Sequence, residues 1–323
     1  MPLVAQLSLF VLGLIVLGVG AELFIRGSVR VARRFGVSPF VIGLTLVGFG
    51  TSAPELVVSL LAALNGQSDI AVGNVVGSNI ANVGLILGVA AVIRVLTAHM
   101  RLLKVETPLV LAASIATWVM AADGNFSRVD GGILLAGFVV VMAYIAVTAR
   151  RESAAVKEEL GKSMPKPERM WLSIVFLVVG LGGLVGGAEL MVRSAVAVAT
   201  AWGVSQTLIG LTIVAVGTSL PELASTVAAA IRGQSDIAVG NVVGSNLFNL
   251  LLILGATAAI SPIEAVDPAV LRFDLPAMTG FAVLLLLVLV NGLKVYRWEG
   301  VILLIAYAGV TAWAVLRSQP VAG

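Results

Sequence analysis

Two glutamates, Glu55 and Glu222, could bind a cation, because each lies inside a long apolar segment and follows the same polar pattern. The surrounding sequences read GFGTSAPEL at 48–56 and AVGTSLPEL at 215–223. The proline in each pattern has no N–H, so a backbone carbonyl one turn earlier loses its hydrogen-bond partner. A carboxylate beside freed carbonyls and hydroxyls offers hard oxygen ligands, which Ca²⁺ prefers and Na⁺ can share. The patterns predict a cation site, and no nearby His or Cys indicates zinc or copper.

The composition places the chain in a lipid bilayer. Hydrophobic residues make up 59% of the chain and charged residues 11%, and the mean hydropathy is +1.08. Such a chain cannot cover itself with a polar surface. A spanning helix needs roughly 20 mainly apolar residues, and the alternation typical of barrel strands is absent. We predict an all-α polytopic membrane protein with ten transmembrane helices. The predicted spans are 4–25, 38–64, 70–94, 103–122, 130–148, 171–198, 205–231, 237–260, 274–292 and 298–316.

Neither Glu55 nor Glu222 has a built-in partner in its predicted span. No Lys or Arg lies at comparable depth in any of the ten segments. A charged side chain near the bilayer centre costs roughly 2.5–3.5 kcal/mol or more unless it is paired or hydrated, and a bound cation would neutralise both carboxylates. Glu22 and Glu189 differ, because each has an arginine four residues later and is predicted to form an i,i+4 pair near a helix end.

The basic residues predict the orientation of the chain. Because loops rich in Lys and Arg stay inside the cell, both termini are predicted to lie outside. The first span lacks the features of a cleaved signal peptide and is predicted to be a retained helix. Most of the 20 Lys and Arg residues fall in loops on one side of the ten predicted spans, and the exceptions are Arg128, Arg193, Arg272 and Arg317.

The sequence contains a long internal repeat. Gly20–Gly88 aligns with Gly187–Gly255 without a gap, and the phrase GQSDIAVGNVVGSN occurs in both copies. The unit holds five predicted spans, and an odd number of spans inserts the second copy upside down. Inverted repeats are typical of secondary transporters, in which matching helix breaks mark the binding site. We predict a first five-helix repeat at 1–149 with its core at 36–90, a cytoplasmic linker at 150–170, and a second five-helix repeat at 171–323 with its core at 203–257.

The repeated phrase places a polar stripe beside each helix break. The helix that carries each copy has three polar residues spaced by four, which share one helix face. They are Asn74, Ser78 and Asn82 in the first copy and Asn241, Ser245 and Asn249 in the second. The serines and the later asparagines are predicted to face the cation. For Asn74 and Asn241, an interhelical hydrogen bond and contact with the cation both stay open. The glycines of the phrase leave a groove for another helix.

Three further titratable residues have structural interpretations. Asp69 and Asp236 follow a Gly-Gln-Ser turn and lie at the start of the third and eighth predicted helices, where an acid suits the positive end of the helix dipole. His99, the only histidine, lies at a helix end and is expected to be a solvated surface residue. With no paired nucleophile and base in the chain, we do not predict an enzyme.

Two motif pairs resemble a known family. GTSAPE with GNVVGSNIAN, and GTSLPE with GNVVGSNLFN, are similar to the alpha repeats of the cation/calcium exchanger superfamily, in particular its prokaryotic sodium/calcium exchanger branch. The resemblance covers essentially the whole chain. It implies that Glu55 and Glu222 share a Ca²⁺ ion, helped by the carbonyls of Thr51 and Thr218. It further implies that the first and sixth helices slide past this core, and that Na⁺ is bound by Ser52, Ser78, Ser219 and Ser245 and by the carbonyls of Gly48 and Ala215.

One position departs from part of that superfamily. The position of Asn249 is Asp in some members, whereas here Asn249 and its counterpart Asn82 are both neutral. The resemblance links that Asp to potassium dependence, so its absence disfavours K⁺ coupling. The proton-coupled branch usually carries an acid in its equivalent of the GNVVGSN phrase. Its absence here disfavours H⁺ exchange and leaves that alternative open.

These observations predict a secondary active antiporter that exchanges Ca²⁺ for Na⁺ by alternating access. Ca²⁺/H⁺ exchange through the same two glutamates is the alternative, and a cation channel is a third interpretation, which the mirrored helix breaks argue against. The expected partners are the lipid bilayer and the two transported ions, with no resident cofactor and no nucleic acid. We expect a monomeric functional unit in the inner or plasma membrane of a prokaryotic cell.

Overall fold

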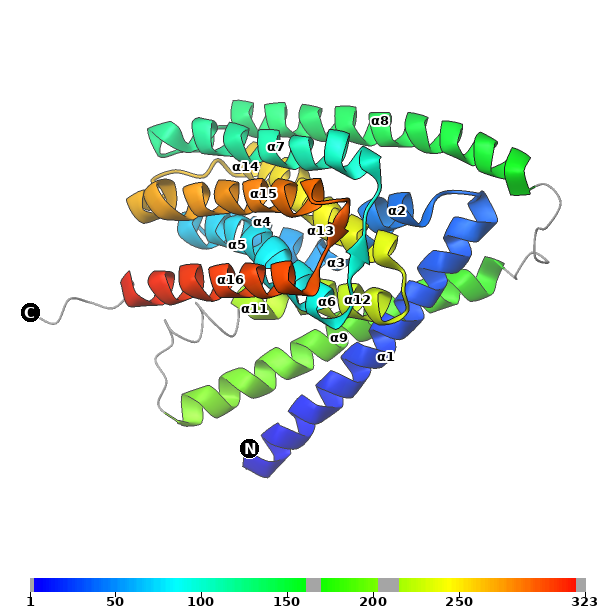
Figure 1. Ribbon diagram of the computed structural model, residues 1–323. Coiled ribbons are helices and arrows are strands. Elements are labelled where there is room, and N and C mark those ends of the chain that lie inside the picture. The colour runs from blue at the N-terminus through cyan, green and yellow to red at the C-terminus, as the bar shows by residue number, and fades with distance from the viewer. Residues whose placement is uncertain (1–2, 161–169, 203–214, 318–323) are drawn as a thin grey trace, which may run out of the picture.

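The structure is almost entirely helical. The computed structural model describes residues 3–160, 170–202 and 215–317 (Figure 1). Within these ranges, the two strands β1 (Leu96–Thr97) and β2 (Lys294–Val295) pair in antiparallel orientation. A single bridge between Phe126 and Ile263 joins two further loops. These short ladders connect loops that are far apart in the sequence, and helices form the rest of the framework.

The helices divide into long straight rods and shorter, interrupted ones. The α-helices are α1 (Leu3–Phe35), α2 (Pro39–Ile42), α3 (Gly48–Thr51), α4 (Ala53–Leu64), α5 (Ser68–Ala81), α6 (Gly88–Ile93), α7 (Thr107–Met120), α8 (Arg128–Leu160), α9 (Met170–Ala201), α11 (Ala215–Thr218), α12 (Leu220–Ile231), α13 (Ser235–Leu247), α14 (Leu254–Ile260), α15 (Leu275–Val290) and α16 (Arg297–Arg317). The π-helical segments are η1 (Gly43–Val47), η2 (Asn82–Leu87), η3 (Leu102–Glu106), η6 (Phe248–Ile253) and η7 (Val270–Asp274), and η4 (Ala121–Asp123) is a 3₁₀ turn.

The number of candidate membrane spans can be compared with the prediction. Eight described segments are long and apolar enough to cross a membrane, and the bent pair Pro39–Thr51 and Ala53–Leu64 would make a ninth. The sequence predicts ten spans. The seventh of these, 205–231, falls partly outside the described residues, and its described part is α11 and α12. The protein is therefore a nearly all-helical membrane protein with eight or nine candidate spans in the described ranges.

The two copies of the repeated phrase form the centre of the bundle. The second copy lies in the continuous span Ser235–Ile260, whose apolar stretch is 94% buried, and the first lies in Ser68–Ile93, which is 72% buried. The other unbroken candidate spans are only 17–39% buried. Both central spans carry a π-helical segment, η2 or η6, directly after the phrase. Several polar side chains of the phrase are thus shielded by the surrounding helices, namely Ser78, Asn79, Asn241, Ser245 and Asn246.

Glycines allow α13 to approach the first half of the chain closely. A Cβ built at Gly244 would lie 2.2 Å from the carbonyl oxygen of Leu44, and one at Gly43 would lie 2.7 Å from that of Ile237. Any larger side chain at these positions would push α13 away from η1, because the obstructing atoms belong to the backbone. This contact joins the two repeats and brings α13 beside the break between α3 and α4.

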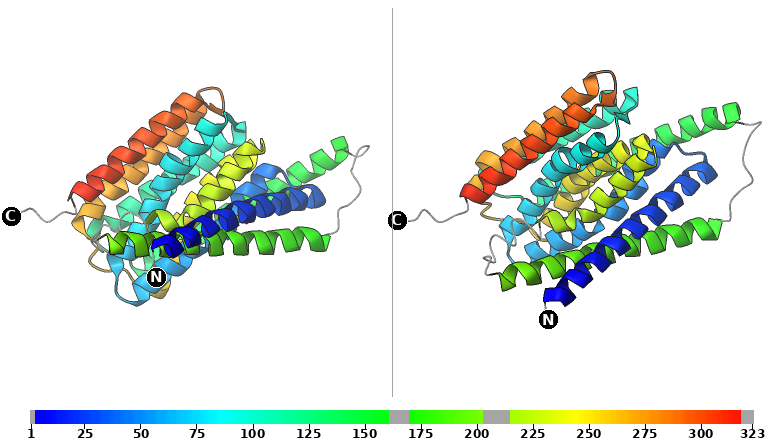
Figure 2. Two further views of the ribbon diagram at one scale, coloured as in Figure 1. Left: turned by 90° about the horizontal axis from the view of Figure 1, so that it is seen from below. Right: turned by 60° about the horizontal axis from the view of Figure 1, so that its bottom comes forward.

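Two long helices, α1 and α9, lie side by side and cross the remaining bundle as a pair (Figures 1 and 2). Glycines again set the distance. A Cβ at Gly20 would lie 2.6 Å from the backbone of Gly183, and a Cβ at Gly187 would lie 2.5 Å from the nitrogen of Leu17. The pair contacts the rest of the protein mainly through α12, against which α1 packs extensively.

Gly131 and Gly132 on α8 provide a matched test of this glycine packing. A Cβ at Gly131 would lie 2.4 Å from the nitrogen of Ala259 on α14, whereas nothing in the described ranges lies within 4 Å of a Cβ at Gly132. Gly131→Ala should lower the free energy of unfolding by about 1–3 kcal/mol, the usual cost of overpacking. Gly132→Ala should leave it unchanged or raise it by up to about 1 kcal/mol. Thermal unfolding of both purified variants in detergent measures the difference, and equal midpoints would contradict this packing.

Candidate functional site

Each predicted helix break is present, and the two have the same backbone geometry. Ser52 separates α3 from α4 with φ −84° and ψ 5°, and Ser219 separates α11 from α12 with φ −89° and ψ 7°. In both cases the helix resumes with a proline in its first two positions and a glutamate in its first turn. Proline suits a helix start because the missing N–H would have no partner there. Each break therefore holds a carboxylate near the positive end of a new helix.

The two breaks meet each other across the centre of the protein. The Ser52 hydroxyl donates a hydrogen bond of 2.9 Å to Oε1 of Glu222, and the Ser219 hydroxyl donates one of 3.3 Å to Oε1 of Glu55. Each serine thus contacts the carboxylate of the other repeat, in a reciprocal pair. Glu55 and Glu222 occupy equivalent positions of the internal repeat. These contacts bring the two glutamates to a single site.

Both carboxylates are buried and only partly satisfied. Glu55 is 1% exposed and Glu222 is 2% exposed. The Oε2 atom of each carboxylate has no hydrogen-bond partner in the part of the chain that the structure describes. Neither glutamate forms an ion pair with a described Lys, Arg or His. A buried anionic group without a counter-charge is strongly unfavourable, so this site is suited to a cation.

The hydroxyl and amide groups of the repeated phrase surround this pair of breaks unequally. Ser78 lies 3.4 Å from the Ser219 hydroxyl, which places it at the junction of the two breaks. Asn82 donates a 3.0 Å hydrogen bond from Nδ2 to Oδ1 of Asn246, which joins the two repeats a turn further on. Ser245 and Asn249 are buried, and their side-chain polar atoms have no partner among the described residues. The two helices that carry the phrase therefore have several buried oxygens without a partner among the described residues.

The remaining predicted residues lie at the same two breaks. Thr51 is fully buried, and its hydroxyl donates to the carbonyl oxygen of Val47 at 3.0 Å. Thr218 ends α11, and its hydroxyl lies 3.5 Å from Oδ1 of Asn74. Gly48 begins α3 and lies against the backbone of α13. Ala215 begins α11, and its side chain lies outside the described part. The roles of these four carbonyls as ligands stay predictions.

For Asn74 and Asn241 the structure records interhelical hydrogen bonds. Asn74 donates from Nδ2 to the hydroxyl of Ser59 at 2.8 Å, and Asn241 donates from Nδ2 to the hydroxyl of Thr226 at 2.8 Å. Ser59 and Thr226 were not among the predicted site residues. Ser59 and Thr226 each lie four residues, about one helical turn, after a glutamate. That spacing places them on the same helix face as Glu55 and Glu222 and could have identified them from the sequence.

Both predicted i,i+4 ion pairs are present, but they lie inside α1 and α9 and not near a helix end as the sequence predicts, because these helices continue to Phe35 and Ala201. Glu22 pairs with Arg26 at 2.7 Å, and Glu189 pairs with Arg193. Asp69 and Asp236 both lie in the first turn of their helices, α5 and α13. The described residues contain no group of three or more His, Cys, Asp or Glu that could hold a metal ion. Any cation ligands beyond the two carboxylates must therefore be hydroxyl, amide, carbonyl or water oxygens.

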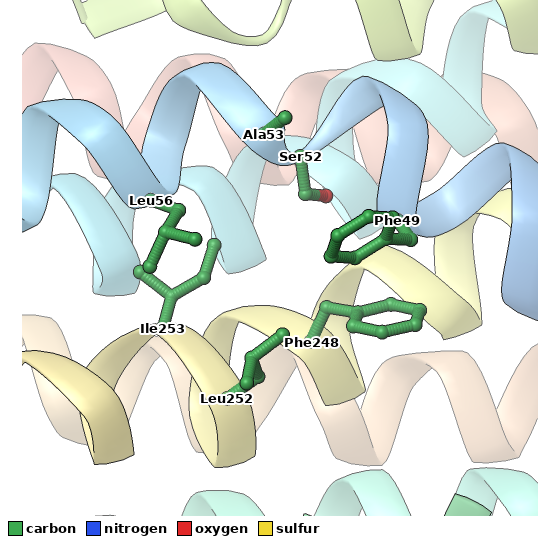
Figure 3. A pocket seen from close by; sticks show the side chains of 7 residues that line it. All are labelled: Phe49, Ser52, Ala53, Leu56, Phe248, Leu252 and Ile253. Carbon is green, nitrogen blue, oxygen red and sulfur yellow. The ribbon is translucent and has the colours of Figure 1, made fainter.

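Figure 3 shows a small pocket beside the first break. Ser52 is the one polar side chain among its lining residues, and its hydroxyl lies near the ring of Phe49. The rings of Phe49 and Phe248 lie 5.6 Å apart between their centroids. Aromatic and aliphatic side chains therefore close this side of the site. The other lining residues are Ala53, Leu56, Leu252 and Ile253.

Comparisons with known proteins agree with this geometry. The family model described as sodium/calcium exchanger protein matches residues 5–147 and 172–316. The chain is 34% identical to the sodium/calcium exchanger MaX1 of Methanosarcina acetivorans, over 93% of this chain and 95% of that protein. It is 36% identical to the inner membrane protein YrbG of Escherichia coli, over 90% of this chain and 88% of that protein.

A solved structure gives the same result for the fold. The sodium-calcium exchanger NCX_Mj, soaked with Na⁺ and Ca²⁺, superposes with a TM-score of 0.82 at 32% sequence identity. The match covers 98% of this chain and 99% of that one. The family model matches both halves of the chain. The two relatives and the superposed structure agree with it. The chain belongs to the sodium/calcium exchanger protein family.

Proposed function

We propose that the protein is a secondary active antiporter that exchanges Ca²⁺ for Na⁺ across the membrane by alternating access. The observation that carries this proposal is the reciprocal pair of contacts in which Ser52 binds Glu222 and Ser219 binds Glu55. It brings together two buried carboxylates that have no basic partner among the described residues. The names of the relatives agree with the two ions.

Glu55 and Glu222 share the Ca²⁺ ion through their unpaired oxygens, with the carbonyls of Thr51 and Thr218 beside them. Support comes from the buried Oε2 atoms, which have no described partner. Na⁺ binds on either side of this point. Its ligands are the hydroxyls of Ser52, Ser78, Ser219 and Ser245, the amides of Asn82 and Asn249, and the carbonyls of Gly48 and Ala215.

The architecture that we propose is two inverted five-helix repeats with ten spans. The repeats are 1–149 and 171–323, with their cores at 36–90 and 203–257 and a cytoplasmic linker at 150–170. The ungapped internal repeat supports this division, as does the reciprocal contact of its two breaks. The distribution of Lys and Arg supports termini outside the cell membrane. One chain contributes both glutamates, so a monomer suffices.

Charge explains why such a site would exchange ions and not leak them. The empty site holds two unpaired carboxylates, and carrying them past a closed apolar barrier would cost several kcal/mol. One Ca²⁺ or two Na⁺ would neutralise both. Only loaded states would then cross readily, and the inward Na⁺ gradient would drive Ca²⁺ out. A third Na⁺ would leave a net positive charge and make the exchange electrogenic.

Uptake of ⁴⁵Ca²⁺ into reconstituted liposomes tests the coupling. Vesicles loaded with Na⁺ should accumulate Ca²⁺ when diluted into Na⁺-free medium, because outward movement of Na⁺ supplies the driving force. Vesicles loaded with K⁺ or choline should not accumulate it. Uptake driven by a pH gradient alone would instead show proton coupling, and uptake without any counter-ion would show a channel.

Removing either central charge tests the site. Glu55→Gln and Glu222→Gln keep the size of the side chain, but each removes one of the two negative charges that would face the buried cation. We expect a loss of about 3 kcal/mol in Ca²⁺ binding, which is about 100-fold in affinity, and no measurable Ca²⁺ flux. Glu189→Gln is the matched control, since Glu189 lies in an exposed pair with Arg193. Normal flux in either central variant would rule out the assignment.

A further inference from the structure

Two amides, of which Asn241 is buried and Asn74 is partly buried, connect the two helix breaks to each other. Asn241 on α13 donates from Nδ2 toward three oxygens of α12, which lie at 2.8–3.4 Å. These are the hydroxyls of Thr226 and Ser225 and the backbone carbonyl of Glu222. Asn74 on α5 repeats the arrangement with α4. Its Nδ2 lies 2.8 Å from the hydroxyl of Ser59 and 3.2 Å from the carbonyl oxygen of Glu55.

The other end of each amide contacts the opposite repeat. Oδ1 of Asn241 lies 3.3 Å from the hydroxyl of Thr51, the last residue before the first break. Oδ1 of Asn74 lies 3.5 Å from the hydroxyl of Thr218, the last residue before the second break. The Thr51 hydroxyl can also donate to the carbonyl of Val47 at 3.0 Å. For Asn241, the hydrogen bond donated to Thr226 is therefore the shortest, and Oδ1 competes with the carbonyl of Val47 for the single proton of the Thr51 hydroxyl.

The chemistry of this position requires an amide. The side chain must donate to the glutamate-bearing helix of its own repeat and accept from the threonine of the other repeat. An ionised aspartate only accepts, and a leucine does neither. Asn241 is 1% exposed, so water cannot readily replace a missing partner. Loss of the N–H groups would leave the oxygens at Ser225 and Thr226 to find new donors.

We infer that Asn74 and Asn241 are positioning residues that set the separation of the two breaks and hence the fit of the site to Ca²⁺. This inference rests on the proposed function. Each amide fixes the backbone of a glutamate and, through a threonine, the break that faces it. A change in either amide would move a carboxylate of one repeat relative to the carbonyls of the other.

Substitution with aspartate separates this role from direct ligation. If Asn241 bound the ion through Oδ1, Asn241→Asp would retain or strengthen Ca²⁺ binding. A positioning role predicts that Asn241→Asp and Asn241→Leu both raise the KM for Ca²⁺ at least tenfold, with a smaller change in kcat. Both kinetic constants come from Na⁺-driven ⁴⁵Ca²⁺ uptake. Ca²⁺-dependent thermal unfolding in detergent gives an independent measure of binding.

A double-mutant cycle locates the effect between the repeats. Thr51→Val removes the hydroxyl that reaches Asn241, so Thr51→Val combined with Asn241→Leu should raise KM by less than the product of the single effects. Ser114→Ala is the control for loss of a buried hydroxyl, because the hydrogen bond of Ser114 in the described ranges goes to Val110 of its own helix. Wild-type affinity in Asn241→Asp would overturn the inference. Absence of a Ca²⁺ response in the wild type would instead overturn the proposed function beneath it.

A different observation concerns the end of the bundle that carries most of the basic residues. Glu22 on α1 forms an ion pair with Arg232, the residue that caps the C-terminus of α12, in addition to its pair with Arg26. The guanidinium of Arg94 lies beside Gly233, where a Cβ would be 3.1 Å away. Glu22 therefore pairs with two arginines, one of them on α12, at the point where α1 meets α12.

The equivalent place in the first repeat lacks this pair. The residue that aligns with Arg232 is Asn65, which caps α4. Glu189, which aligns with Glu22, pairs with Arg193 on its own helix. In the described ranges α4 also has no contact with α1 or α9 comparable to that of α12 with α1. An ion pair thus joins α1 to α12, whereas the aligned positions on α9 and α4 do not form one.

We propose that Glu22 and Arg232 form a latch that favours closure at the cytoplasmic end of the protein. The pair links α1 to α12, so it exists only while these two helices lie against each other. The mirrored state gains no equivalent pair, because asparagine stands at position 65. The latch would therefore bias the two access states unequally, by roughly fivefold for a partly exposed ion pair.

Distances between spin labels test the latch without measuring transport. The chain contains no cysteine, so Phe35→Cys at the end of α1 and Lys294→Cys in β2 give two unique label sites. Arg232→Asn introduces the residue that stands at the aligned position 65 of the first repeat. It should increase the population of a second distance between the two labels. The exchange Glu22→Arg with Arg232→Glu should restore the original distribution, and Glu189→Gln should not change it. An unchanged distribution in Arg232→Asn would overturn the latch, whatever the transported ions are.

Discussion

The structure depends on two carboxylates that are buried together and have no basic partner in the described part of the chain. Glu55 and Glu222 are almost fully shielded, and a serine hydroxyl from the opposite break satisfies one oxygen of each. Hydroxyls stabilise a carboxylate without neutralising it, so the site retains its demand for positive charge. A lysine or arginine at this point would remove that demand permanently. The surrounding polar groups are therefore serine, threonine and asparagine, which can support a carboxylate and can also contact a cation.

Bringing such groups together requires interrupted helices held at short range. An unbroken helix uses its own carbonyls, whereas the breaks at Ser52 and Ser219 stop one helix and start another within a single residue. Glycine packing then allows these breaks to meet. The contact of Gly244 with Leu44 puts α13 directly against the segment that leads into the first break. Backbone approach at this distance leaves no room for lipid, which explains why the most buried span carries the polar phrase.

The sequence predicts features that depend on local chemistry. Pro54 and Pro221 mark the breaks, and the four-residue spacing of Glu22 and Arg26 predicts their pair, because both effects act within one or two turns. The reciprocal contact of Ser52 with Glu222 was not predictable in this way, since apolar spans carry little information about which neighbour each will face. For the same reason the sequence left open whether Asn74 forms an interhelical hydrogen bond or contacts the cation. Its hydrogen bonds depend on Ser59, and a serine in an apolar helix commonly bonds its own backbone.

The two halves of the site differ even where their sequences are identical. Asn82 reaches Asn246 across the repeats, whereas Asn79, the counterpart of Asn246, bonds the carbonyl of Val75 in its own helix. A site that must open to two sides needs matched ligands only where it touches the ion, because the same ion binds from either side. The helix ends are under no such requirement. Differences such as Arg232 against Asn65 can therefore accumulate there, and they alter the balance between the two states without altering what the site binds.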